Sequence, residues 1–307
     1  MDKFRVMALS IFLILIVLVP ISVVNSETEF RFIWPLKSEK ISSKLSSLFG
    51  ESRMDHFHNG IDLVSVNEEV RSIADGKIVF SRYSEDSPFD SEYGTGNCVW
   101  ISHPKGIMSA YYHLKEARVD FSKSGNLVKQ GEVVGYTGNT GHSSGAHLHF
   151  VVASDNGAKL INPLLILPEI EDHTIPEIGG LTLSVGENYT NINDGDNINV
   201  SKNFPLTVTI FDKGEKSGQR RGVQYIGFKF NGVKIKESKF NEISLKNGKW
   251  TNDDHLSFDD LFFNGNYYVG DLALKSGENT IEVNVSDFHG NKNTKSFSFY
   301  VNRITGR

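Results

Sequence analysis

The chain has 307 residues, a net charge of −5, and a composition of 39% hydrophobic and 22% charged residues, which is typical of globular proteins. The sequence contains no Lys/Arg-rich block, so we expect no nucleic-acid partner. Cys98 is the only cysteine, which excludes an intramolecular disulfide and a metal site built from several thiolates. The length predicts about two domains.

The N-terminal segment, residues 1–26, has the pattern of an export signal. Lys3 and Arg5 precede an apolar stretch over residues 6–24, and small residues before Glu27 offer a cleavage site. The apolar stretch is also long enough to remain as a membrane anchor, and both alternatives stay open. In either case we expect the rest to be exported to the periplasm or cell envelope of a bacterium, because exported chains without disulfides are typical of that compartment.

Residues 27–168 are predicted to form an antiparallel β domain. Short runs rich in β-branched and aromatic residues alternate with glycine-containing turns, as at 77–80, 98–102 and 132–136. Helical periodicity is scarce, and we expect at most a turn or two of helix within residues 41–49. Cys98 lies in one of these runs and is interpreted as a buried, structural residue.

A linker and a second β domain are predicted to follow, which makes the whole chain all-β. Prolines flank an acidic stretch in residues 169–179, and this pattern indicates a linker. Residues 180–305 alternate apolar with polar positions between Asn-Gly turns, which favours an immunoglobulin-like β-sandwich. We expect an accessory role for this sandwich, although no residue in it identifies its partner.

Four residues have the spacing of a metal site. His147 and His149 are two apart in a predicted strand, so both imidazoles point to the same face. His58 and Asp62 are four apart, which on a straight strand would be about 13 Å. Two side chains that share one zinc need ligating atoms within roughly 3–4 Å of each other. We therefore expect the chain to turn between them, at Asn59-Gly60.

These residue types predict a hydrolytic zinc site. A catalytic zinc usually takes three protein ligands and leaves one position for water, and His58, Asp62 and His149 would supply the three. His147 would then accept the proton of that water, and His113 would lie behind the site or stabilise the developing oxyanion. The sequence has no His-Glu-x-x-His, which excludes a metalloprotease site of the helical kind.

Other histidines and tyrosines are assigned lesser roles. We interpret His56 as an exposed loop residue rather than a ligand, and we place His142 on a loop near the site. His103 and His289, together with His173 and His255, are interpreted as surface or turn residues. Tyr111 and Tyr112 alternate across a predicted strand, so one should be core and the other can line a groove.

Together these motifs resemble the lysostaphin-like (LytM-like) zinc metallopeptidases. The resemblance covers roughly residues 33–168 in the expected order, and its segments are Phe49-Gly50, His58-x-x-x-Asp62, Asp75-Gly76-Lys77-Ile78-Val79, Tyr112-His113-Leu114, Lys129-x-Gly131-Glu132-Val133-Val134-Gly135, Gly138-Asn139-Thr140-Gly141 and His147-Leu148-His149-Phe150. The resemblance implies that His58, Asp62 and His149 bind one zinc and that His113 and His147 are catalytic. It also implies endopeptidase activity on the peptides of bacterial cell-wall peptidoglycan, for wall remodelling or daughter-cell separation.

One departure from the family pattern and one alternative function accompany the resemblance. Residues 84–93 form a polar, acidic insertion where many relatives run directly between strands, so substrate preference is the least transferable property. Some relatives have lost the metal residues and act as binding modules that activate separate wall amidases. Retention of all five site positions favours the enzyme over that alternative.

Overall fold

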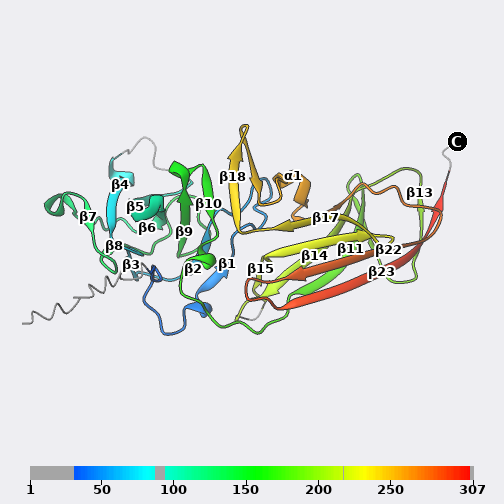
Figure 1. Ribbon diagram of the computed structural model, residues 1–307, viewed down its shortest axis with the longest axis horizontal. Coiled ribbons are helices and arrows are strands. Elements are labelled where there is room, and N and C mark those ends of the chain that lie inside the picture. Colours follow the sequence, from blue (N-terminus) through cyan, green and yellow to red (C-terminus); the bar gives the residue numbers. More distant parts are fainter. Residues whose placement is uncertain (1–30, 87–93, 217, 305–307) are drawn as a thin grey trace, which may run out of the picture. The chain divides into compact units, whose positions relative to one another are not determined.

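We describe the protein from a computed structural model, which covers residues 31–86, 94–216 and 218–304 (Figure 1). The predicted N-terminal signal or anchor, including residues 6–24, lies outside this part, as do residues 87–93 of the predicted insertion. Within the described residues, no helix combines the length and apolar character needed to cross a membrane. Nearly all regular structure there is antiparallel β-sheet, which confirms the predicted all-β class.

The first half of the chain is built on one main sheet. Its strand order is β19-β18-β10-β9-β6-β5-β4-β7, with β2 joining β9 and β1 joining β2. Two of these strands, β18 (Glu242–Lys246) and β19 (Lys249–Asn252), come from the second half of the chain. The strands and 3₁₀ turns (η) of this half are η1 (Ile41–Ser43), β1 (Leu45–Ser47), β2 (Ile61–Val64), β3 (Glu69–Arg71), β4 (Gly76–Arg82), η2 (Ser84–Asp86), β5 (Asn97–Ser102), η4 (Pro104–Gly106), β6 (Met108–Leu114), η5 (Ser122–Ser124), β7 (Leu127–Val128), β8 (Val133–Tyr136), β9 (His147–Ser154), η6 (Asp155–Gly157), β10 (Lys159–Ile161) and η7 (Pro163–Leu165). The helix expected within residues 41–49 is limited to η1, and β1 follows it.

The second half is a sandwich of two sheets, as the alternating pattern predicted. One sheet has the order β12-β11-β14-β21-β20 and the other has the order β13-β23-β22-β16-β17. The elements are β11 (Glu177–Val185), β12 (Asn188–Ile192), β13 (Asn197–Val200), β14 (Leu206–Lys213), β15 (Arg220–Arg221), β16 (Tyr225–Phe230), β17 (Val233–Lys239), β18 (Glu242–Lys246), β19 (Lys249–Asn252), α1 (Phe258–Leu261), β20 (Phe262–Phe263), β21 (Asn266–Gly270), β22 (Gly277–Ser286) and β23 (Lys292–Arg303). Alternate residues of β22 are buried, because one face of that strand packs into the sandwich.

The hairpin β18–β19 leaves the sandwich and extends the main sheet. Strand β18 pairs with β10 in the register Lys159↔Ser244, Leu160↔Ile243 and Ile161↔Glu242, and Figure 1 shows β18 standing beside β10. This pairing is not predictable from the sequence, because the alternation of apolar and polar residues in the hairpin does not identify its partner strand. The second half of the chain thus reaches into the sheet that carries His147 and His149.

Two hydrophobic cores support these sheets, and the first half contributes to both. The core of the main sheet includes Leu63, Tyr111 and Phe150. The core of the sandwich contains Phe49 and Phe57 from the first half, packed with sandwich residues such as Phe240, Phe258 and Phe262. The ring of Phe57 lies 5.5 Å from that of Phe258 and 6.1 Å from that of Phe262, both edge-on.

Candidate metal centre

His58 and Asp62 meet because the chain turns before β2 begins. The Nε2 atom of His58 lies 3.1 Å from Oδ1 of Asp62, as the sequence spacing required. Gly60 sits between them, and a Cβ at this position would overlap the backbone carbonyl oxygen of Phe150 on β9. Only glycine therefore lets this turn approach β9 closely enough to bring both side chains to the strand.

The register of β2 against β9 brings the third residue to the same point. Asp62 pairs directly with His149 across the two strands. The Nδ1 atom of His149 lies 2.8 Å from Oδ1 of Asp62 and 3.0 Å from Nε2 of His58. These three atoms form one compact group, and the sequence-predicted ligands are the three residues that come together there.

The hydrogen bonds around this group leave three lone pairs facing one another. Nδ1–H of His58 donates to the carbonyl oxygen of Leu48 at 2.7 Å, so its Nε2 has no proton in the neutral ring. Nε2–H of His149 donates to Oδ1 of Asn59 at 2.8 Å, so its Nδ1 has none either. With a carboxylate oxygen of Asp62 beside them, three acceptors lie within 3.1 Å without a hydrogen between them. A cation would relieve this arrangement.

The donor set fits Zn²⁺. Two imidazole nitrogens and one carboxylate oxygen are typical zinc ligands, and ligands about 2.0–2.1 Å from a tetrahedral ion lie about 3.3 Å apart, close to the separations seen here. Burial lowers the pKa of His149 to about 4, so this ring is neutral and able to ligate at pH 7. Burial raises the pKa of Asp62, but the charges and hydrogen bonds of His58 and His149 outweigh it and hold that pKa well below its usual range.

A cationic side chain holds the other oxygen of Asp62. The Arg53 guanidinium donates to Oδ2 of Asp62 at 2.9 Å and pairs with Glu51 at 3.2 Å. Asp62 is thereby oriented with Oδ1 toward the two histidines. Both Arg53 and the Asn59 amide were missed as site residues by sequence reasoning, because a supporting hydrogen bond leaves no spacing pattern in the sequence.

The two remaining histidines, His147 and His113, stand beside the ligand group. Nδ1–H of His147 donates to the carbonyl oxygen of Gly145 at 2.7 Å, and its Nε2 lies 3.7 Å from Oδ1 of Asp62. Nδ1–H of His113 donates to the carbonyl oxygen of Thr140 at 2.8 Å. The centres of the two rings are 4.8 Å apart. Each neutral ring therefore carries its lone pair on Nε2, the atom opposite its anchored N–H.

His113 has a strained backbone. Its φ angle is +61°, a left-handed value that is uncommon for a residue with a side chain. The backbone N–H of His113 donates to the carbonyl of Thr95 at 3.0 Å, which holds this conformation together with the ring's bond to Thr140. Burial lowers the pKa of His113, so the ring is neutral at pH 7. Strain of this kind is found at functional sites more often than elsewhere.

All five predicted site residues line one hollow of about 810 Å³. Tyr112 also lines it, with its ring parallel to that of His149 at 5.5 Å, whereas Tyr111 is buried in the core. One tyrosine thus lies in the core and the other lines the hollow, as their alternation across the strand predicted. His142 lies at the edge of the same hollow, and His56 is exposed and paired with Asp55 at 2.5 Å.

Two other sequence interpretations have clear outcomes. His103 was expected to be a surface or turn residue, and its surface alternative is wrong. The residue lies between β5 and η4 but is buried, with Nδ1 3.0 Å from the carbonyl oxygen of Asp75 and Nε2 2.7 Å from Oγ of Ser109. Cys98 is buried as predicted, and burial raises the pKa of its thiol to about 11, which leaves it unreactive at neutral pH.

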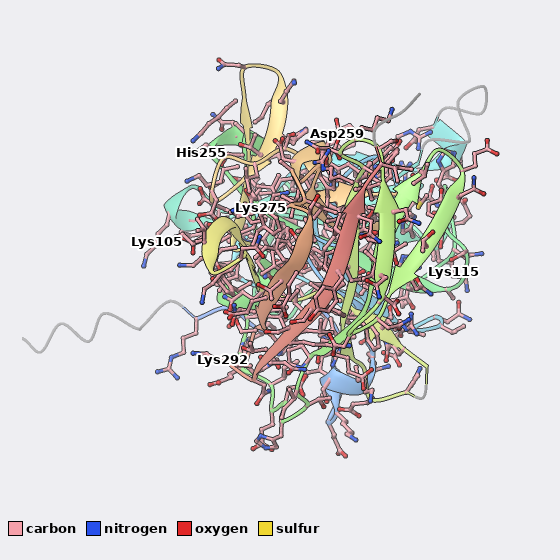
Figure 2. The ribbon with its side chains drawn as sticks, turned by 90° about the vertical axis from the view of Figure 1, so that its right-hand side faces the viewer. Lys105, Lys115, His255, Asp259, Lys275 and Lys292 are labelled. Atoms are coloured by element: carbon pink, nitrogen blue, oxygen red, sulfur yellow. The ribbon has the colours of Figure 1, made fainter. Side chains whose placement is uncertain are left out.

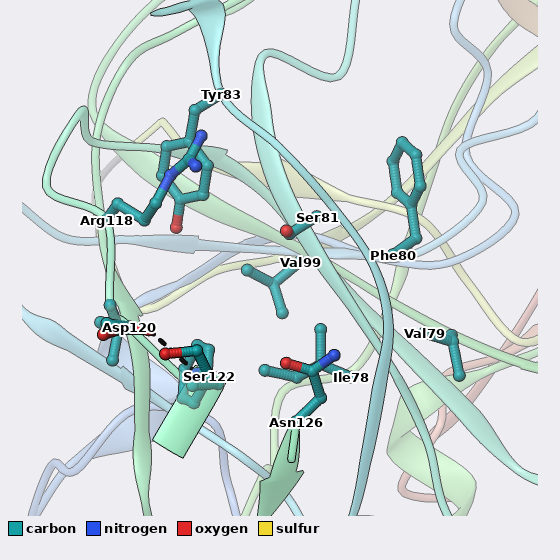
Figure 3. Close-up of a pocket in the computed structure, with 12 residues that line it drawn as sticks. Ile78, Val79, Phe80, Ser81, Tyr83, Val99, Arg118, Asp120, Ser122 and Asn126 are labelled. Atoms are coloured by element: carbon teal, nitrogen blue, oxygen red, sulfur yellow. Dashed lines mark hydrogen bonds between the residues drawn. The ribbon is translucent and has the colours of Figure 1, made fainter. Parts of the chain in front are cut away.

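A separate hollow of about 400 Å³ lies at the β4 side of the main sheet (Figure 3). Tyr83 and Phe80 line it, and the Arg118 guanidinium stacks over the Tyr83 ring at 4.7 Å. It shares no lining residue with the histidine hollow. Strand β4 is separated from β9 by β5 and β6, so this hollow is not part of the candidate metal centre.

Comparison with known proteins agrees with this geometry. The sequence model of peptidase family M23 matches residues 56–163, which include His58, Asp62, His113, His147 and His149. Residues 56–163 of the chain are thus similar to an M23 peptidase domain. A second family model, which has no descriptive name, matches residues 175–302. The region matched by the M23 model therefore contains the complete histidine cluster, and the sandwich lies outside that region.

Two curated relatives and one solved structure each match less than half of the chain. The DD-carboxypeptidase/endopeptidase Mpg of Neisseria meningitidis is 35% identical over 133 residues, which are 41% of this chain and 27% of the relative. The glycyl-glycine endopeptidase ALE-1 of Staphylococcus capitis is 37% identical over 95 residues, 30% of this chain and 24% of the relative. A zinc-containing peptidase from Vibrio cholerae of known structure is 28% identical, with 43% of this chain and 39% of that chain covered and a TM-score of 0.35. The chain thus spans about a quarter of the length of the first two relatives.

Proposed function

We propose that the protein is an exported zinc-dependent endopeptidase that hydrolyses peptide bonds of bacterial peptidoglycan. The observation that carries this proposal is the convergence of three possible ligand atoms, from His58, Asp62 and His149, beside two histidines whose Nδ1 atoms are anchored to backbone carbonyls. The M23 match and the endopeptidase names of the relatives support the reaction class and the substrate. The two relatives' names differ in the bond implied, so the bond itself is left to experiment.

The chain's own residues suit the hydrolysis of a peptide bond. A zinc ion held by His58, Asp62 and His149 would polarise the scissile carbonyl and make water acidic enough to attack it. His147 accepts the proton at Nε2, since its Nδ1–H is held by Gly145. His113 offers a lone pair at Nε2, so it assists proton transfer first and can stabilise an oxyanion only after it has gained a proton.

The proposal also assigns the protein's cellular location and the role of each segment of the chain. Residues 1–26 would export the chain to the periplasm or cell envelope and either be removed or remain as an anchor. Residues 27–168 would form the peptidase domain, 169–179 the linker and 180–305 the accessory sandwich. A role in wall remodelling or daughter-cell separation follows from the substrate.

Digestion of purified peptidoglycan tests the proposal most directly. The full chain, loaded with zinc and with its metal content measured, should release peptides whose masses show one type of hydrolysed bond. A chelator should stop the release, and restored zinc should recover it. A zinc-loaded protein that releases nothing would contradict the proposal, and stimulation of a separate amidase by the metal-free protein would favour the activator alternative.

A further inference from the structure

A second hollow, of about 420 Å³, adjoins the metal centre and has walls from both halves of the chain. The first half contributes Phe57, Asn59 and Leu160, and the second half contributes Trp250 and Phe258. The hollow shares His56 and Asn59 with the histidine hollow. Asn59 is also the residue whose Oδ1 accepts the hydrogen bond of His149. The two hollows therefore meet one side chain away from a predicted metal ligand.

The wall from the second half is held firmly in place. Hydrogen-bonded pairing of Leu160 with Ile243 attaches β18 to β10, and β19 returns along β18 with Trp250 opposite Leu245. Phe258 of α1 packs edge-on against Phe57 at 5.5 Å. Sheet pairing and aromatic packing together fix the hairpin β18–β19 and α1 beside the metal centre without needing a ligand.

The lining of this hollow is that of a binding site. Its floor is apolar, from Phe57, Leu160, Ile243 and Phe258, and its rim carries charges of both signs. Trp250 leaves 38% of its surface exposed there. A large aromatic side chain that is exposed in a concave site and surrounded by polar groups is the usual anchor of a bound partner.

The charges on the rim indicate which chemical class of ligand the hollow can bind. Lys249 supplies a cation, and Asp55 and Asp259 supply carboxylates; Asp259 is labelled in Figure 2. All three are exposed. A uniformly anionic polymer would be repelled by the carboxylates, whereas a peptide that carries both an amine and a carboxylate can pair with both signs.

We propose that this hollow binds the peptide residues next to the cleaved bond, so that the C-terminal half of the chain forms part of the substrate site. The inference rests on the proposed peptidase function. It assigns to this hollow the choice of peptide that the proposed peptidase accepts. A group in this hollow must be bonded within a residue or two of the cleaved carbonyl, because the hollow begins at Asn59. Peptide, rather than the more distant glycan, meets this condition.

The test compares Trp250→Ala with a matched control, Phe80→Ala. Phe80 is 42% exposed and lines the separate hollow at the β4 side of the sheet. Substrates are cross-linked peptidoglycan peptides freed of glycan by an amidase, and the same peptides with the disaccharide attached. We expect Trp250→Ala to raise KM about tenfold on both substrates with little change in kcat, and Phe80→Ala to change neither constant. Trp250→Phe should recover most of the loss.

Binding provides a readout that does not depend on turnover. In a His113→Ala background, calorimetry with the glycan-free peptides should show a Kd weakened about tenfold by Trp250→Ala. Thermal unfolding of each variant checks that its fold is retained. Equal KM and Kd for the Trp250 and Phe80 variants would overturn the inference, and so would a loss confined to disaccharide-bearing peptides, which would assign the hollow to sugar. An inert wild-type protein would instead contradict the proposed function.

Discussion

The five clustered side chains differ in which of their atoms remain available after their hydrogen bonds are made. His149 turns a lone pair toward His58 and Asp62, which is the reason for proposing it as a metal ligand. His113 is anchored through Thr140 and stands outside that group, with its ring centre 5.9 Å from that of His149. Two residues with the same side chain are thus assigned to different steps.

Alanine substitutions should separate these two roles. His149→Ala removes one of three ligands, and we expect the purified variant to lose its zinc as well as its activity. His113→Ala keeps all three ligands, and we expect about one zinc per chain with turnover reduced by roughly 10²–10⁴-fold. Metal analysis and peptidoglycan digestion on the same samples check both. A fully active His113→Ala protein would remove that residue from the mechanism.

Asn59 should control how tightly the metal is held. Its Oδ1 fixes the ring of His149 by accepting from Nε2–H at 2.8 Å. Loss of a partner of this kind typically weakens metal affinity about 10–100-fold. We expect Asn59→Ala to show that loss in competition with a chelator while its unfolding temperature stays close to that of the parent. Asn191→Ala, on the exposed strand β12, is the control and should bind zinc as the parent does. Parent-like affinity in Asn59→Ala would show that β9 alone orients His149.

At the level of elements, the site depends on the closeness of β2 and β9. Gly60→Ala places a methyl group against the carbonyl oxygen of Phe150, so β2 must move away from the strand that carries His149. We expect a loss of about 1–3 kcal/mol in the free energy of unfolding, together with weaker zinc binding. Gly145 borders the same site, but a methyl group there meets nothing within 4 Å. Gly145→Ala should therefore be close to neutral in denaturant titrations, and equal stability of the two variants would contradict the argument.

Strands in which apolar and polar residues alternate could be predicted from the sequence, whereas the strands that they pair with could not. Alternation of apolar and polar residues located strands such as β22, in which every second residue is buried over most of its length. The spacing of His58 and Asp62 required a turn, and the structure contains it. The pattern of β18 and β19 is equally compatible with a strand of the sandwich, so their pairing with β10 could not be read from it. Asn59 and Arg53 could not be predicted as site residues for a related reason. A hydrogen-bond partner is defined by its position in space and leaves no spacing pattern in the sequence.

For the molecule as a whole, the sequence pattern indicates two domains joined by a linker, but the two halves pack together more closely than that description implies. Residues 32–307 form one compact unit. Phe49 and Phe57 of the first half are buried in the core of the sandwich, and the sandwich returns a hairpin to the edge strand β10. The Gln219 side chain also donates to the backbone carbonyl of Leu45 at 2.8 Å. These contacts tie the first half of the chain to the second half.

This sharing of cores predicts that the first half of the chain will not be stable alone. Expressed as residues 27–168, it would expose the edge of β10 and the rings of Phe49 and Phe57, which are 0% and 5% exposed in the full chain. Burial of a phenylalanine contributes about 1.5–3 kcal/mol. Two such losses amount to a large part of the roughly 5–15 kcal/mol that stabilises a typical domain.

We therefore expect the fragment 27–168 to aggregate, or to unfold at a temperature well below that of a chain covering 27–307, in thermal scans and size-exclusion chromatography. Phe57→Ser with Phe49→Ser in the fragment should improve its solubility, because the exposed rings would be the cause of association. The same pair of substitutions in the longer chain should destabilise it, since there both rings lie in the sandwich core. A fragment that unfolds cooperatively at the temperature of the longer chain would show that the main sheet needs neither the hairpin β18–β19 nor the shared core.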